Sequence, residues 1–201
     1  MAFLMSTERT QKASFAHVAI YHVSLAYNML MNKATSRTWW TRISDHLILG
    51  ALPLRDRDHH TQLKNEEGVV AVVTMNQPFE LLPSVLGTPV TPEDWHDLGI
   101  DQCFGHTPDF SPPALATLIA CVHFTKKHID QCGTVYVHCK AGRGRSTIVV
   151  AAYLLHENGG WSVDDALAFI KAKRPHIAMQ RPLLVDYHQY LHATQHRPNK
   201  L

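Results

Sequence analysis

The sequence predicts an α/β domain with one mixed, mostly parallel β-sheet flanked by helices. Strand-like and helix-like segments alternate along the chain, which is the pattern of parallel strands joined by helical crossovers. The continuous β-branched run in GVVAVVTMN, residues 68–76, is typical of a strand covered on both faces. At 201 residues, with 45% hydrophobic and 18% charged side chains, the chain has the size and composition of a single domain with a substantial core.

Charge, cysteine content and histidine spacing exclude several classes of protein. The formal net charge is only +2, so any affinity for anions has to come from local clusters of basic residues. The four cysteines form no C-x-x-C pair, and the chain is not a small secreted disulfide scaffold, so we expect free thiols in a reducing compartment. The 15 histidines are scattered without paired spacing, so we expect neither a metal site nor a metal cofactor.

Residues 1–37 form an N-terminal segment that differs in composition from the domain predicted at 38–201. Glu8 is its one acid, and the run between Lys12 and Lys33 carries no charge. Three interpretations are open: a helix that packs on the domain, a segment that contacts a membrane or directs mitochondrial import, and a helix that spans a bilayer. The basic, acid-poor composition favours membrane contact or import, and the polar residues within the run make a full span the least expected.

The first predicted elements lie before residue 105. HLILGALPL at 46–54 indicates a strand, and the run at 68–76 indicates the next one. TPEDWHDLG at 91–99 indicates a short helix after a proline-containing loop, and IDQCF at 100–104 indicates a further strand.

The second half of the chain alternates in the same way. HTPDFSPP at 106–113 contains three prolines and is expected to be a loop, after which Pro113 can open a helix. Ser162 is placed to cap a helix, with Asp165 completing a variant capping box, and Pro175 ends that helix. The further predicted segments are a strand at 134–138 and helices at 114–129, 147–160, 162–174 and 181–193.

VHCKAGRGRS, residues 137–146, joins a predicted strand to a predicted helix. A helix N-terminus presents free backbone N–H groups and a partial positive charge, which together favour an anion. Gly142 and Gly144 allow the loop to curl so that its amides converge on one point, and Arg145 adds a planar fork for two phosphate oxygens. We therefore expect a tetrahedral oxyanion to be held by Lys140, Ala141, Gly142, Arg143, Gly144 and Arg145.

Cys139 lies at the floor of this expected cradle. A thiol beside a helix N-terminus and guanidinium groups has a lowered pKa and is a thiolate at neutral pH. A thiolate below a bound phosphorus is a nucleophile for phosphoryl transfer. Ser146 is placed to donate a hydrogen bond to the sulfur and stabilise it as a leaving group, and His138 is expected to orient the loop.

The motif His138-Cys139-x5-Arg145-Ser146 resembles the signature loop of the cysteine-dependent protein-tyrosine phosphatase superfamily. From about Trp39 to the last helix, the segments LGALPLRD, VVTMN, EDWHDLGIDQ, YVHCKAGRGRS and VVAAYL resemble its dual-specificity-type mitochondrial branch. Members of that branch dephosphorylate phosphatidylglycerophosphate on the way to cardiolipin. The resemblance implies a protein-tyrosine phosphatase-like fold and a phosphocysteine intermediate, with no cofactor.

The resemblance also implies an aspartate general acid on a mobile loop some tens of residues before the cysteine. Asp109 fits, because it lies on the proline-rich loop after a predicted strand. Asp101 is expected within that strand, and Asp94 and Asp97 within the preceding helix. One departure from the family lies after VVTMN, where QPFE replaces an acidic, aromatic loop and keeps Glu80 as its acid.

The function expected from these residues is hydrolysis of a phosphate monoester. Lys140 and Arg143, together with the apolar N-terminal segment, favour an anionic phospholipid at a membrane surface over a phosphoprotein, which stays the alternative substrate. The expected location is the matrix side of the mitochondrial inner membrane, with the cytoplasm as the alternative. A non-catalytic phosphate-binding module is less expected. Nucleic acid is not an expected partner, because the chain has no extended basic face and no aromatic platform.

A disulfide between Cys132 and Cys139 is not expected. Cys132 lies on or just before the same strand, which places the two residues roughly 20 Å apart. A disulfide needs Cα atoms within about 7 Å of each other. The sequence gives no indication of the oligomeric state.

Overall fold

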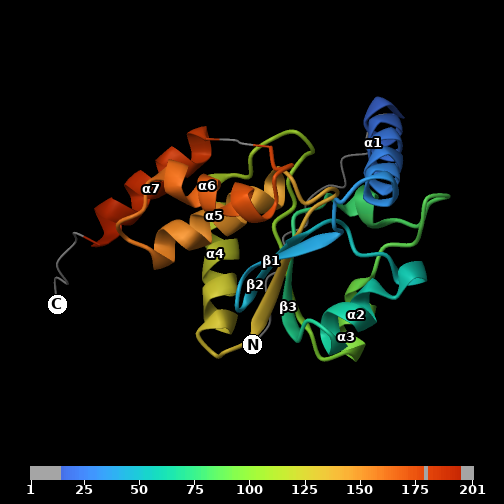
Figure 1. Cartoon of the computed structure of the whole chain (residues 1–201), viewed down its shortest axis with the longest axis horizontal. Helices are drawn as coiled ribbons and strands as arrows, with labels where there is room; N and C mark the ends of the chain where they lie inside the picture. Colours follow the sequence, from blue (N-terminus) through green and yellow to red (C-terminus); the bar gives the residue numbers. More distant parts are fainter. Residues whose placement is uncertain (1–14, 179–180, 196–201) are drawn as a thin grey trace.

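A computed structural model describes residues 15–178 and 181–195 of the chain. The described residues form one five-stranded sheet in the order β1-β2-β5-β3-β4 (Figure 1). β1 runs antiparallel to β2 and the other neighbours are parallel, which confirms the mixed, mostly parallel sheet. The strands are β1 (Trp40–Ser44), β2 (Leu47–Gly50), β3 (Val69–Thr74), β4 (Asp101–Phe104) and β5 (Thr134–His138).

Helices cover both faces of this sheet. Four of them, with α5 at their centre, pack on one face around Leu118, Ile148 and Leu167, while α2 and α3 cover the other face around Leu63 and Trp95 (Figure 1). The helices are α1 (Phe15–Ala34), α2 (His59–Asn65), α3 (Pro92–Asp97), α4 (Leu115–Ile129), α5 (Arg145–Glu157), α6 (Val163–Lys173) and α7 (Pro182–Gln195), with short 3₁₀ turns η1 (Arg55–Arg57) and η2 (Pro78–Leu81).

β5 is the central strand, and all of its residues are buried. Its last residue, His138, pairs with Gly50 of β2 on one side and Thr74 of β3 on the other. The carboxyl ends of three parallel strands therefore meet at one edge of the sheet. In open α/β sheets this edge forms the crevice in which ligands bind.

Two elements that the sequence did not predict are β1 and α2. β1 pairs with β2 from Trp40 to Ser44, although its sequence WTRIS alternates weakly. α2 has the polar sequence HHTQLKN, in which only His59 and Leu63 are buried, so it lacks the apolar period that predicts a helix. The helix expected from Pro113 begins two residues later, at Leu115, after Ala114 as its N-cap.

The N-terminal helix α1 packs on the domain through one face. Tyr21 and Leu25 are buried against Trp39 and Leu52, and the Tyr21 hydroxyl donates a hydrogen bond to the Glu80 carbonyl at 2.8 Å. α1 therefore packs on the domain, although its composition favoured membrane contact. Membrane contact and the domain boundary at 37/38 both stay predictions. Across residues 15–178 and 181–195, every helix is too short or too polar to cross a bilayer. Residues 1–14, which carry part of the predicted import signal, lie outside the described residues.

Candidate active site

The loop between β5 and α5 curls around a point above Cys139. Gly142 has φ +64°, and a Cβ atom there would lie 2.5 Å from the backbone carbonyl of Gly50. This position therefore needs glycine for both conformation and space. Gly144, the N-cap of α5, has φ −116°. Of the two glycines in this loop, only Gly142 therefore has the positive φ that a tight turn requires.

Arg174 braces the same loop from outside. It is buried, and its guanidinium donates hydrogen bonds to the carbonyls of Gly142 at 2.9 Å and Ala141 at 3.3 Å. It also reaches the Thr38 carbonyl at 3.2 Å, which ties the loop to the segment before β1. Burial lowers the pKa of Arg174 to about 10. This role could not be predicted from sequence, because Arg174 resembled an ordinary basic residue at a helix end.

Cys139 is buried at the floor of the loop, as the sequence predicted. Burial by itself raises the pKa of its thiol, but Arg145, the Ser146 hydroxyl and the backbone amides of Ser146 and Arg143 outweigh it, and the net pKa is lowered. The Ser146 hydroxyl donates to the Cys139 sulfur over 3.2 Å. The arrangement favours a thiolate that is already surrounded by hydrogen-bond donors.

Arg145 lies beside the sulfur and is held by a buried carboxylate. Its guanidinium makes a bidentate pair with Glu80, with Nη1–Oε2 at 2.6 Å and Nη2–Oε1 at 3.0 Å, and the two side chains are 2% and 0% exposed. Burial opposes the charge of Arg145, yet the bonds to Glu80 and the nearby Cys139 raise its pKa. Glu80 stands on η2, and the sequence signal for it was its survival as the acid of QPFE.

The structure brings Asp109 to the same place. Its Oδ1 lies 3.1 Å from Nη2 of Arg145, and its Oδ2 forms an ion pair with Lys140. The other aspartates considered from sequence lie elsewhere. Asp101 pairs with His128 at 3.4 Å at the opposite end of β4, and Asp94 caps α3.

His138 does not face the cavity above the sulfur. Its Nε2 lies 2.9 Å from the hydroxyl of Thr74, and its ring stacks on Tyr136 with 5.4 Å between centroids. Full burial, with Arg145 nearby, lowers the pKa of His138 to about 3, so the ring is neutral. It is placed to fix the end of β5, from which the loop starts.

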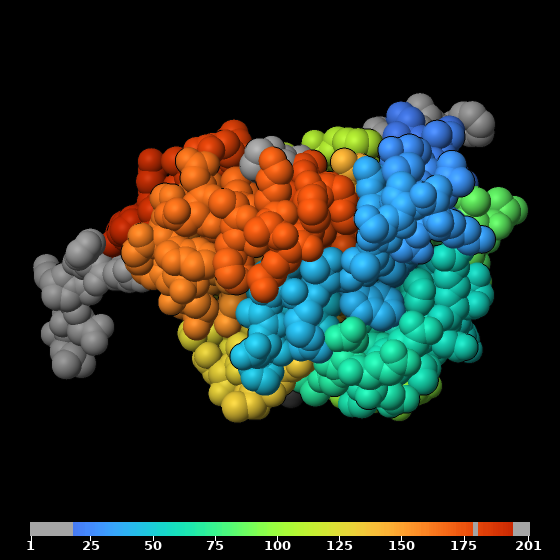
Figure 2. Space-filling model, viewed as in Figure 1, coloured from blue at the N-terminus to red at the C-terminus, as the bar shows by residue number. Residues whose placement is uncertain are grey.

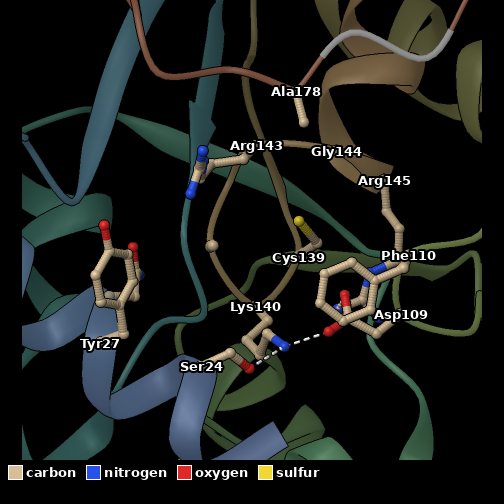
Figure 3. Close-up of a pocket in the computed structure, with 12 residues that line it drawn as sticks. Ser24, Tyr27, Asp109, Phe110, Cys139, Lys140, Arg143, Gly144, Arg145 and Ala178 are labelled. Carbon is tan, nitrogen blue, oxygen red and sulfur yellow. Dashed lines mark hydrogen bonds and ion pairs between the residues drawn. The ribbon is translucent and has the colours of Figure 1, made fainter. Parts of the chain in front are cut away.

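A cavity of about 220 Å³ opens above Cys139 (Figure 3). Figure 3 shows Lys140 between Ser24 of α1 and Asp109, with Phe110 beside them and Arg143 directed away from Asp109. The lining residues are Ser24, Tyr27, Asn28, Asp109, Phe110, Cys139, Lys140, Ala141, Arg143, Gly144, Arg145 and Ala178. Figure 2 shows α1 in blue beside the yellow-green loop that carries Asp109. The contribution of α1 was missed, because nothing in its composition places three of its residues at the cavity.

The other chemistry considered from sequence can be placed as well. All four cysteines lie within the described residues, and each is a free thiol. Within residues 15–178 and 181–195, acidic, cysteine and histidine side chains do not gather in threes where a metal ion could bind.

A protein-family model matches residues 108–190 of the chain, from just before Asp109 to α7. The family is described as dual specificity phosphatase, catalytic domain. The match contains the whole loop from Cys139 to Ser146 and therefore covers both the predicted nucleophile, Cys139, and the predicted general acid, Asp109.

Known proteins resemble the chain well beyond that segment. Phosphatidylglycerophosphatase and protein-tyrosine phosphatase 1 from Rattus norvegicus is 34% identical over 198 residues, which cover 94% of this chain and 97% of the relative. Phosphatidylglycerophosphate phosphatase PTPMT1 from Arabidopsis thaliana is 34% identical over 85% of this chain, which spans about half (49%) of that relative's length. The crystal structure of PTPMT1 in complex with PI(5)P matches with a TM-score of 0.71 and 34% identity, over 79% of this chain and 99% of that one.

Proposed function

We infer the substrate of this chain from its family, because the chain belongs to the dual-specificity-type phosphatases represented by phosphatidylglycerophosphatase and protein-tyrosine phosphatase 1. It is a cysteine-dependent phosphatase. We propose that it removes the terminal phosphate of phosphatidylglycerophosphate to give phosphatidylglycerol, a step toward cardiolipin. One observation carries the proposal: a single cavity combines a nucleophile, an anion-binding loop and an acid with an apolar rim.

The proposed reaction has two steps. The Cys139 thiolate attacks phosphorus in line, a sulfur–phosphorus bond forms, and the bond to the ester oxygen breaks. Asp109 gives its proton to the departing oxygen and then takes a proton from the water that hydrolyses the phosphocysteine. Arg145 and the loop amides hold the equatorial oxygens, and the Ser146 hydroxyl stabilises the sulfur as it leaves. Inorganic phosphate departs and the thiolate is restored.

A lipid substrate is supported by the rim of the cavity. Tyr27 and Phe110 line the cavity and expose about half and three quarters of their surfaces respectively. Lys140 and Arg143 supply positive charge in the same cavity, beyond what Arg145 provides. An apolar rim around a cationic cavity matches a phosphate headgroup that carries an apolar body. The family name also includes protein-tyrosine phosphatase, so a phosphoprotein is the second candidate substrate.

The proposed site of action is a membrane surface. Ile20, Val23, Tyr27 and Leu30 repeat at helical spacing along α1 and are exposed. α1 contains no acid, so an anionic bilayer meets no repulsion from this stripe. Together with the acid-poor, basic start of the sequence, this supports the matrix side of the mitochondrial inner membrane as the location.

The substrate assignment is tested by comparing two substrates with one enzyme. Phosphate release by the full chain is measured on two separate substrates: vesicles that contain phosphatidylglycerophosphate, and a soluble phosphotyrosine peptide. Cys139→Ser is the inactive control. We expect the lipid to give the higher kcat/KM and Cys139→Ser to release no phosphate above background. Peptide turnover without lipid turnover would exclude the lipid assignment, and an active Cys139→Ser would exclude the mechanism.

The same assay tests the acid. Asp109→Asn is expected to slow hydrolysis of an alkyl phosphate by roughly a hundredfold or more, because the departing alkoxide needs a proton. Asp101→Asn is the matched control, since its carboxylate pairs with His128 outside the cavity. If Asp101→Asn causes the loss and Asp109→Asn does not, the acid has been assigned to the wrong residue.

A further inference from the structure

The Lys140 ammonium joins three segments that are distant in sequence. Lys140 is only 4% exposed, and its Nζ lies 2.5 Å from the hydroxyl oxygen of Ser24 on α1. The same Nζ forms the ion pair with Asp109 on the acid loop. It also lies 5.7 Å from the ring centre of Tyr21 and 5.3 Å from that of Phe110, within the range of cation–π attraction. One buried cation thus links α1, the acid loop and the phosphate-binding loop.

The hydrogen bond between Ser24 and Lys140 has a defined direction. The Ser24 hydroxyl donates back along α1 to the Ile20 carbonyl at 2.6 Å, with the Tyr21 carbonyl at 3.1 Å. A hydroxyl has one hydrogen and two lone pairs, so the oxygen is free to accept from Lys140. An ammonium can donate three hydrogen bonds and cannot accept any. Ser24 therefore fixes the direction of Lys140, and Lys140 in turn donates to Asp109.

The acid loop has little else to hold Asp109 in place. The next residue, Phe110, is 74% exposed and has φ +61°, a left-handed conformation that is unfavourable for a residue with a side chain. Apart from Lys140, the carboxylate is held by Arg145 at 3.1 Å. In the proposed reaction the phosphate oxygens replace Asp109 at the guanidinium of Arg145, which leaves Oδ1 of Asp109 free to carry the proton. Lys140, which pairs with Oδ2, is then the main support of Asp109 when the substrate is bound.

We propose that Ser24 of α1 is a positioning residue for the catalytic acid, acting through Lys140 on Asp109. α1 then contributes a residue to the active site in addition to the face that it exposes to solvent. The inference rests on the proposed function, because it needs Asp109 to be the general acid. It assigns to the N-terminal helix a part in catalysis that the loop motif does not contain.

The test is Ser24→Ala in the full chain, assayed on two soluble substrates. One is an aryl phosphate whose leaving group departs without a proton, and the other is an alkyl phosphate whose leaving group needs one. We expect kcat to fall about tenfold on the alkyl phosphate and less than twofold on the aryl phosphate, a part of the full general-acid effect. Alanine has the higher helix propensity, so the change does not weaken α1 through its backbone.

Two further variants separate positioning from general damage. Ser24→Thr keeps a hydroxyl and is expected to restore the rate on the alkyl phosphate. Thr35→Ala is the matched control. The Thr35 hydroxyl makes a similar hydrogen bond, to the Met31 carbonyl at 2.5 Å, but it lies near the end of α1 and outside the cavity. This variant is expected to leave both rates unchanged. An equal loss on both substrates in Ser24→Ala, or a rise in KM alone, would overturn the proposal.

A double-mutant cycle completes the test. If Ser24 acts through Asp109, adding Ser24→Ala to Asp109→Asn causes no further loss on the alkyl phosphate. A further tenfold loss would show that Ser24 acts independently and would overturn the inference alone. If Asp109→Asn slows hydrolysis of the alkyl and the aryl phosphate equally, the assignment of Asp109 as the acid is wrong, and the inference about Ser24 is wrong with it.

Discussion

Arg145 is surrounded by three acidic groups: the thiol of Cys139 and the carboxylates of Glu80 and Asp109. Two guanidinium nitrogens of Arg145 donate hydrogen bonds to the Glu80 carboxylate, and this pair is fully buried. This pair aims Arg145 at the cavity before any substrate arrives. Pre-aimed donors cost no reorganisation at the moment of reaction, which is how such groups stabilise transition-state charge.

The buried pair leads to a prediction about stability. Glu80→Gln is expected to lower the free energy of unfolding by about 3–5 kcal/mol, because it removes the fully buried carboxylate that pairs with two guanidinium nitrogens of Arg145. Glu67→Gln is the matched control, since Glu67 pairs with Arg42 at 2.7 Å on the surface and such pairs contribute about 0–1 kcal/mol. Urea denaturation of both variants measures the difference. Equal losses would show that burial of the Glu80 pair does not set its importance.

The residues that could be predicted from sequence are those close to one another in the chain. Cys139, Arg145 and Ser146 lie within one loop, so fixed spacing was enough to assign their surroundings. The partners that fix their positions are remote: Glu80 is 65 residues from Arg145, and Ser24 is 116 from Lys140. Local spacing carries no information about contacts of this range, because they depend on how the elements pack.

At the scale of elements, α1 has two faces with different partners. Tyr21 and Leu25 are buried against the domain, whereas Val23 and Leu30 are 72% and 60% exposed. Both faces are apolar, so sequence periodicity could not separate the face that packs from the face left exposed. The capping box of α6, from Ser162 to Asp165, was predicted correctly because its whole signal lies within one turn.

The exposed face of α1 leads to a prediction about membrane binding. Val23→Glu is expected to weaken binding to anionic phospholipid vesicles by about tenfold or more, because it removes apolar contact and adds a repelled charge. Val185→Glu is the matched control, since Val185 is also exposed but lies on α7, at the other end of the molecule (Figure 1). Vesicle co-sedimentation measures binding, and hydrolysis of a soluble aryl phosphate confirms intact chemistry. Equal binding by the two variants would contradict a membrane-facing α1.

At the scale of the whole molecule, the fold class was predictable because it depends on the order of elements. The strand order was not, because sequence does not say that β5 inserts between β2 and β3. That insertion places the loop after β5 at the centre of the sheet edge. It also buries His138. Elsewhere in the fold His59 is buried and His176 is half-buried, and neither gains a carboxylate partner that outweighs the cost of burying a charged imidazole.

These histidines give the molecule a predictable dependence on pH. Burial is the largest cause in each case, and it lowers the pKa of His138 to about 3 and those of His59 and His176 to about 4. In the unfolded chain the same side chains take up protons below about pH 6.5. The unfolded state therefore binds more protons than the fold, and stability is lost as pH falls from about 6.5 toward 4.

The measurement is urea denaturation at about pH 7.5 and about pH 5.5, a window in which surface carboxylates stay ionised. We expect the free energy of unfolding to be lower at the acidic end. The lowered pKa of Cys139 acts in the same direction, so the histidine share has to be isolated by a variant remote from the cavity. His59→Gln serves, because His59 packs against Trp39 and Trp40 and accepts a bond from the Leu54 amide at 3.2 Å. It is expected to reduce the loss between the two pH values, and an unchanged loss would show that His59 titrates normally in the fold.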